Sequence, residues 1–187
     1  MQSAVHSAAI VRGIPVLIEN PRADIDTSRV LARLDRALAL IERYQPWRFR
    51  HLRGDIAAVA IKPFPCRGAY FPADRTILTE LTFLAREAEF SDAIVASSIL
   101  HEGVHARVDR MAQRMGFRRL EAHRAREERV CRGAEGAFGA SLPPALGAPV
   151  LERVGALSGL SDREVAPAIN WAAAWAAKRE ADRRLRL

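Results

Sequence analysis

The stretch that decides the fold is SDAIVASSILHEGVHARVDRMAQRM, residues 91–115. Ser91 is a good helix N-cap, Asp92 suits a first helical turn, and the apolar run that follows predicts a buried helix. Gly116 comes directly after the stretch and is a residue type that commonly ends helices. We therefore expect one long helix from about Ser91 to Met115.

A zinc-binding pattern lies in the middle of this predicted helix. His101 and His105 are four residues apart, so both side chains project from the same helix face. Two imidazoles on one face can hold a single Zn²⁺ at about 2.0–2.1 Å. Glu102 falls beside them, where a carboxylate can act on water as a general base. The pattern His-Glu-x-x-His therefore predicts a zinc hydrolase, and the alternative is a chance pair of helical histidines.

The composition is that of an ordinary globular protein. The chain has 187 residues, of which 49% are hydrophobic and 27% charged. Cys66 and Cys131 are too few and too far apart for a disulfide framework. No apolar run is long enough for a membrane span, and residues 1–20 lack the features of a signal peptide. We expect a cytoplasmic protein with no membrane partner.

The net charge of +7 comes almost entirely from arginine, because Lys62 and Lys178 are the only lysines. The arginines are spread along predicted helices among acidic residues, and aromatic residues make up only 6% of the chain. A nucleic-acid-binding protein more often gathers its charge on one face among aromatic side chains. The pattern argues against a nucleic-acid partner, whereas attraction to acidic partners stays open.

Hydrophobic periodicity predicts an α+β fold, with a small mixed β-sheet packed on two long helices. The segment 141–161 is rich in Gly and Pro, which favours a catalytic domain over 1–140 and a helical extension over 141–187, packed on the same domain. The expected strands are 15–19, 55–62, 68–71 and 76–79, and the expected helices are 27–44, 91–115, 120–138, 150–157 and one from about 162–167 almost to the C-terminus.

A catalytic zinc usually has three protein ligands, so a third must be found. The predicted helix 120–138 offers His123, Glu127, Glu128 and Glu135. A glutamate about twenty residues past the second histidine, on an antiparallel neighbouring helix, can reach the same metal. Glu128 is favoured because it shares a helix side with Cys131, which is expected to face the core. Glu127, Glu135 and His123 stay open as alternatives.

With these residues the chain resembles the gluzincins, the thermolysin-like zinc peptidases, and in particular their minimal single-domain members. The resemblance implies one Zn²⁺ per chain held by His101, His105 and Glu128, with Glu102 as general base. It implies cleavage of a peptide or protein substrate that binds along an edge strand, either 68–71 or 76–79. Tyr70 and His123 are candidate donors to the developing oxyanion.

Two other functions stay open from the sequence. One is a non-catalytic, zinc-bound regulatory or protein-binding module of the same fold. The other is a nucleic-acid-binding protein in which the histidine pattern is incidental. The sequence leaves the substrate and the oligomeric state undetermined.

Overall fold

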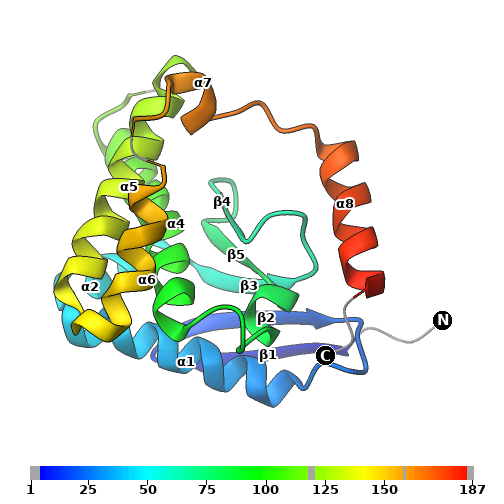
Figure 1. The fold of residues 1–187 in the computed structure, drawn as a ribbon. Helices are drawn as coiled ribbons and strands as arrows, with labels where there is room; N and C mark the ends of the chain where they lie inside the picture. Colours follow the sequence, from blue (N-terminus) through cyan, green and yellow to red (C-terminus); the bar gives the residue numbers. More distant parts are fainter. Residues whose placement is uncertain (1–4, 118–120, 158, 185–187) are drawn as a thin grey trace.

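The computed structural model describes residues 5–117, 121–157 and 159–184 and has an α+β fold (Figure 1). A five-stranded mixed sheet carries helices on one of its faces. Its strands are β1 (Val5–Val11), β2 (Ile14–Asn20), β3 (Ala58–Lys62), β4 (Gly68–Phe71) and β5 (Thr76–Glu80), in the spatial order β1-β2-β3-β5-β4. The predicted α+β class and mixed sheet are confirmed.

The sheet is mixed because two hairpins flank a parallel centre. β1 pairs antiparallel with β2, β2 and β5 both run parallel to β3, and β4 pairs antiparallel with β5. The tight turn between β1 and β2 places Arg12 and Gly13 at φ of 49° and 76°, the positive values that two-residue hairpin turns require. β4 therefore ends the sheet on one side, and β1 ends it on the other.

The helices follow the predicted order with changed boundaries. They are α1 (Thr27–Tyr44), α2 (Pro46–Asp55), α3 (Leu81–Ala85), α4 (Asp92–Arg114), α5 (Arg124–Ser141), α6 (Pro144–Gly155), α7 (Asp162–Val165) and α8 (Trp171–Arg184), with a 3₁₀ turn (Glu121–His123) before α5. The prediction of a helix over 27–44 is confirmed, and Asp26 caps it by accepting from the Ser28 backbone N–H at 2.8 Å. The predicted start of the second long helix at Leu120 lies outside the described residues.

Several elements were missed or misplaced. Strand β1 and helices α2 and α3 were not expected. Pro46 ends the predicted first helix but also begins α2, because proline is tolerated in the first turn, where its missing N–H is not needed. The helix predicted over 150–157 is α6, which starts at Pro144, and the single C-terminal helix is divided into α7 and α8.

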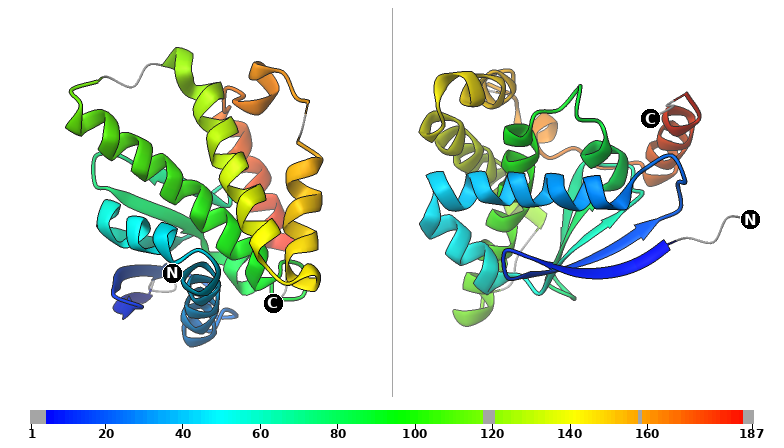
Figure 2. Two further views of the ribbon diagram at one scale, coloured as in Figure 1. Left: turned by 90° about the vertical axis from the view of Figure 1, so that its left-hand side faces the viewer. Right: turned by 90° about the horizontal axis from the view of Figure 1, so that it is seen from below.

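The core lies between one face of the sheet and the helices α1, α2 and α4 (Figure 2). Along β2, buried residues alternate strictly with exposed ones, so one face is covered and the other is open. On the open face Leu17 of β2 is 53% exposed. The five-stranded sheet therefore serves as a platform on which α4 is fixed.

Helix α4 is the central helix of the fold. Its N-cap Ser91 accepts from the Ile94 backbone N–H at 3.3 Å, as the sequence predicts. Residues 93–100 are all buried, because α1 and the sheet cover one side of this half and α5 and α6 approach the other. Burial on all sides fixes the position of the motif residues that come next in the helix.

The C-terminal segment crosses from α6 to the far side of β4 and β5, where α8 lies (Figure 1). Trp171 and Trp175 both contact the ring of Phe64, with centroids 5.7 and 5.9 Å away. Lys178 also forms an ion pair with the buried Glu80, with Nζ and Oε1 3.1 Å apart. None of the described helices is long and apolar enough to cross a membrane.

Candidate metal centre

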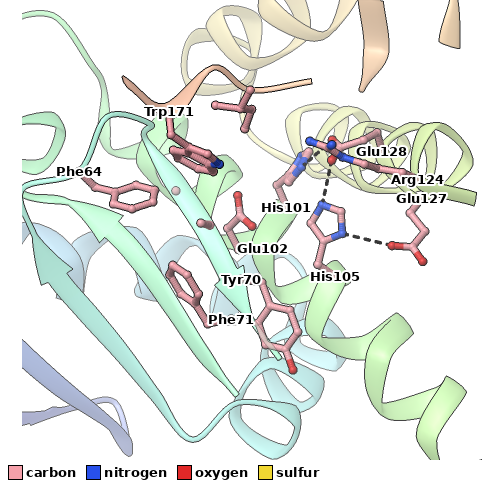
Figure 3. Close-up of a pocket in the computed structure, with 13 residues that line it drawn as sticks. Phe64, Tyr70, Phe71, His101, Glu102, His105, Arg124, Glu127, Glu128 and Trp171 are labelled. Carbon is pink, nitrogen blue, oxygen red and sulfur yellow. Dashed lines mark ion pairs between the residues drawn. The ribbon is translucent and has the colours of Figure 1, made fainter. Parts of the chain in front are cut away.

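His101 and His105 lie side by side on the face of α4 that turns towards α5 (Figure 3). Their ring centroids are 5.1 Å apart, as expected for residues one helical turn apart. Their side chains are 16% and 12% exposed. The two imidazoles are therefore largely desolvated but still open to a cleft.

Glu128 of α5 bridges the two imidazoles. Its Oε2 lies 3.3 Å from Nε2 of His101, and its Oε1 lies 3.4 Å from Nε2 of His105. Ligand atoms around a tetrahedral zinc with bonds of about 2.0–2.1 Å are separated by roughly 3.3 Å. Each Nε2 atom thus lies at a ligand-to-ligand distance from one oxygen of Glu128, and the chemical types of the three side chains fit zinc.

The other nitrogen of each imidazole faces a second carboxylate. Nδ1 of His101 lies 3.3 Å from Oε1 of Glu135, whose side chain is 3% exposed. Nδ1 of His105 lies 3.8 Å from Oε2 of Glu127. Metal-binding histidines usually donate their second N–H to such a partner, which fixes the ring orientation and leaves Nε2 for the metal. The three acids therefore face different nitrogen atoms: Glu128 faces both Nε2 atoms, Glu135 faces Nδ1 of His101, and Glu127 faces Nδ1 of His105.

The carboxylates shift the protonation of the centre strongly. Burial disfavours an imidazolium at His101, yet the carboxylates of Glu128 and Glu135 outweigh it and raise the pKa of His101 to about 10. Burial likewise opposes ionisation of Glu128, but hydrogen bonds from His101 and His105 hold its pKa well below its usual range. Without a metal, these shifts favour a positively charged His101 beside an ionised Glu128.

Glu102 lines the same cleft and lies against the first residue of β4. A Cβ added to Gly68 would lie 3.1 Å from Oε1 and 3.2 Å from Cγ of Glu102, so glycine permits this close approach. Burial raises the pKa of the Glu102 carboxyl; the charges of His101 and His105 oppose this effect, and those of Glu128 and Glu135 add to it. A carboxyl of raised pKa is suited to both taking and returning a proton near neutral pH.

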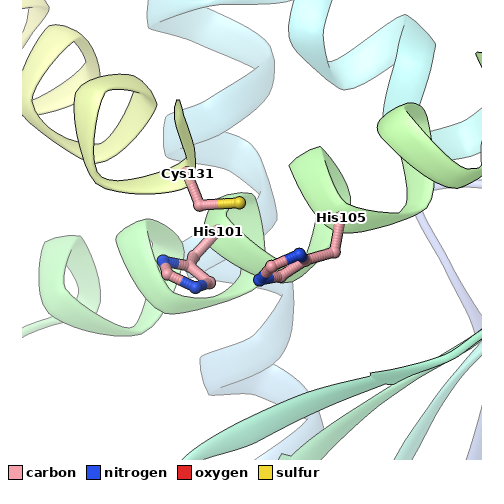
Figure 4. A group of neighbouring side chains, drawn as sticks. All are labelled: His101, His105 and Cys131. Carbon is pink, nitrogen blue, oxygen red and sulfur yellow. The ribbon is translucent and has the colours of Figure 1, made fainter. Parts of the chain in front are cut away.

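The thiol of Cys131 lies beside the two histidines (Figure 4). Its Sγ and one nitrogen of each imidazole all lie within 4.8 Å of one another. Cys131 is fully buried, and burial with nearby carboxylates raises the pKa of its thiol. The sequence predicts that Cys131 faces the core, and it does pack against Val104 and Ala134. The structure makes it a further donor near the centre.

A cleft of about 400 Å³ joins the centre to β4 (Figure 3). Residues 68–71 of β4 form one wall, and the motif residues of α4 with the first turns of α5 form the opposite wall. Phe64, Ile169 and Trp171 complete the lining, so with Phe71 of β4 the cleft has an apolar part. The cleft therefore has an ionic side and an apolar side along one edge strand.

The remaining predicted candidates have different outcomes. His123 is exposed and is not among the residues that line the cleft. Tyr70 does line it, and its hydroxyl donates to Oδ2 of Asp109 at 3.1 Å. Asp109 is buried on α4 and accepts hydrogen bonds from Tyr70 and Gln113. Of the two expected edge strands, 68–71 lines the cleft.

Sequence reasoning missed several residues of the cleft. Arg124 begins α5 and lines the cleft beside Glu127 and Glu128. Phe64 and Trp171 come from segments about a hundred residues apart in the chain, so no local sequence pattern connects them. The chain matches no protein-family model, no curated protein and no solved structure in the comparisons made.

Proposed function

We propose that the chain is a zinc-dependent hydrolase, and specifically a gluzincin-like metallopeptidase with zincin-like packing of a small sheet on α4 and α5. One observation carries the proposal. The Nε2 atoms of His101 and His105 lie 3.3 and 3.4 Å from the carboxylate of Glu128, with Glu102 in the same cleft. Two imidazoles and one carboxylate leave a fourth position for water, as in catalytic zinc sites.

The chemistry divides between the metal and the protein. Zinc supplies a Lewis acid that makes water more acidic and polarises the scissile carbonyl group. Glu102 accepts the proton of the attacking water and returns it to the leaving amine. The burial that raises the pKa of Glu102 brings this carboxyl closer to the operating pH for both transfers. Arg124 lines the cleft and is the candidate group for stabilising negative charge on the substrate, whereas the Tyr70 hydroxyl donates to Asp109.

Peptide backbone is the substrate that the cleft fits best. β4 is the outermost strand on its side of the sheet and lines the cleft, so a substrate can add to it as a further strand. The carbonyl and N–H groups of such a strand bind in a fixed register, which places one peptide bond beside Glu102. The aromatic side chains of Phe64, Phe71 and Trp171 would contact apolar substrate residues.

The test combines metal analysis with a proton-transfer variant. Wild type should contain one zinc per chain, and His101→Ala should contain none after identical purification and zinc re-addition. Glu102→Gln should keep the zinc and lose cleavage of every peptide that the wild type cleaves. Wild type without zinc would refute the metal centre, and full turnover by Glu102→Gln would refute the assigned general base.

A second candidate function is a non-catalytic zinc-bound module, and the position of Cys131 favours it. His101, His105 and Cys131 can approach one ion, and structural zinc sites commonly combine histidine with cysteine ligands. In that case Cys131→Ala should lose zinc and unfold with it, and no peptide should be cleaved. In a catalytic site Cys131→Ala keeps the zinc, because His101, His105 and Glu128 hold it.

A further inference from the structure

A second cavity, of about 330 Å³, adjoins the catalytic cleft. The two share Gly68, His101 and Glu102, so the second cavity opens beside the proposed general base. The rest of its lining is polar and comes from Arg67, Ser98, Glu135 and Arg153. A side chain of a peptide bound along β4 can therefore enter a cavity whose chemistry differs from that of the aromatic cleft.

Two arginines from distant parts of the chain meet at this cavity. Arg67 directly precedes β4, and Arg153 lies on α6. Nη1 of Arg153 is buried and has no hydrogen-bond partner within the described part of the chain. Across the same described ranges, neither arginine forms an ion pair. A buried guanidinium nitrogen without a partner is costly, and an anion would satisfy it.

Arg67 is held in place by stacking rather than by an acid. Its guanidinium lies over the ring of Phe90 at 4.7 Å and near that of Phe83 at 5.5 Å. Although the residue as a whole is exposed, partial desolvation of its guanidinium lowers the pKa of Arg67, and the positive charge of Arg153 lowers it further. The two guanidinium groups thus repel one another, and a negative group between them would remove that repulsion.

The buried acid in the cavity wall does not fill this role. Glu135 faces Nδ1 of His101 at 3.3 Å, and its attraction for Arg67 is weaker than the repulsion from Arg153 and Arg86. The presence of Glu135 and Glu102 in the wall also selects the kind of anion that the cavity can accept. A doubly charged phosphate would be repelled by both carboxylates, whereas a singly charged carboxylate meets less repulsion.

We propose that this cavity is a specificity subsite that binds the carboxylate of a substrate residue next to the scissile bond, through Arg67 and Arg153. The carboxylate belongs either to an Asp or Glu side chain or to the C-terminus of a short substrate. Arginine pairs with carboxylate through two parallel N–H groups, which gives direction as well as charge. The proposal rests on the metallopeptidase function proposed above and adds a preference for acidic substrates.

The test uses matched peptides that differ by one charge. Each substrate with Glu or Asp next to the scissile bond is paired with its Gln or Asn counterpart, and a second set pairs a free C-terminus with a carboxamide. Binding is measured by calorimetry on the zinc-loaded Glu102→Gln protein, and cleavage is measured on the wild type. Acidic side chains should be preferred by about tenfold or more in the first set, or free termini in the second, which identifies the source of the carboxylate.

Charge-neutral variants identify the arginines responsible. Arg153→Gln and Arg67→Gln should each reduce the preference to less than about threefold, and their Gln- and Asn-peptides should bind as before. Arg29→Gln, an exposed arginine of α1 outside the cavity, is the matched control and should keep the full preference. If Arg153→Gln does not fold, Arg67→Gln decides, because Arg67 is exposed and lies outside the helices and strands.

The outcomes separate this subsite from the proposed function. Cleavage of peptides with no preference for the carboxylate in either set would overturn the subsite and leave the peptidase standing. A preference that survives in both Arg67→Gln and Arg153→Gln would also overturn it. Preferential binding of acidic peptides that are never cleaved would support the subsite and refute the peptidase.

Discussion

Glu135→Gln should weaken zinc binding without removing a ligand. Glu135 lies 3.3 Å from Nδ1 of His101, and its side chain is 3% exposed, so water replaces little of the lost interaction. Changing a partner of a metal-binding histidine typically costs about 10- to 100-fold in metal affinity. That range corresponds to about 1.4–2.7 kcal/mol of binding free energy.

The same reasoning predicts an order among three glutamates. Glu127 lies 3.8 Å from Nδ1 of His105, beyond hydrogen-bond distance, and its side chain is 13% exposed. We expect Glu127→Gln to cost about fivefold or less, the size of a weakly coupled ion pair. Glu128→Gln should cost the most, because its carboxylate faces both Nε2 atoms. Glu152→Gln, an exposed glutamate of α6, is the control with no expected effect.

The assay is a competition titration with a chromophoric zinc chelator at one fixed pH, on the four variants and the wild type. Thermal unfolding of the metal-free proteins should accompany it, since loss of fold would also weaken binding. Wild-type affinity in Glu135→Gln would refute the assigned support of His101. A larger loss in Glu127→Gln than in Glu128→Gln would show that the third ligand is assigned to the wrong residue.

Three further predictions follow from the contacts. Because the pKa of His101 is raised to about 10, its proton must leave when zinc binds, and zinc affinity should rise roughly tenfold per pH unit from about pH 6.5 towards 10. Calorimetry in buffers of different ionisation enthalpy should detect the released proton. A zinc affinity that does not change with pH would contradict this prediction. Gly68→Ala should displace the Glu102 carboxylate by a few tenths of an ångström and reduce kcat about tenfold with zinc content unchanged. The reason is that misplacement of a catalytic group by about 1 Å can cost about 100-fold in rate. An unchanged kcat would show that the position of Glu102 does not depend on glycine at residue 68. Gly147→Ala would place a Cβ 2.2 Å from the backbone carbonyl oxygen of Gly139 in α5. The free energy of unfolding, measured by denaturant titration, should therefore fall by about 3 kcal/mol. The control Gly133→Ala has open space around its Cβ and should not lower the free energy of unfolding.

The sequence was most informative where local interactions determine the structure. The N-cap Ser91, the apolar run after it and the end near Gly116 are all within one helix, and α4 has the expected boundaries within about a residue. Helical periodicity alone places His101 and His105 side by side. Strand β1 was missed because its sequence, VHSAAIV, alternates only weakly, and α2 was missed because its residues PWRFRHLRGD have almost no apolar periodicity.

Contacts between distant segments could not be predicted in the same way. The choice among the acids of α5 depends on how that helix is rotated against α4, which packing decides. Glu135 turns inward to His101 because Ala134 and Phe138 are buried beside it. Arg153 reaches the second cavity only because α6 packs closely against α5, at the contact of Gly147 with Gly139. None of these positions follows from spacing along the chain.

The arrangement of carboxylates explains how an ordered site can exist before a metal binds. Several carboxylates surround the two imidazoles in a desolvated site, and the pKa of His101, raised to about 10, favours a proton there that offsets part of their charge. Glu135 lies beside Nδ1 of His101, and Glu128 lies beside Nε2. The proton that zinc would displace is therefore the one on Nε2. If the site binds zinc as proposed, the metal would compete with this proton for the position beside Glu128. This competition is why metal affinity and pH are expected to be coupled at this centre.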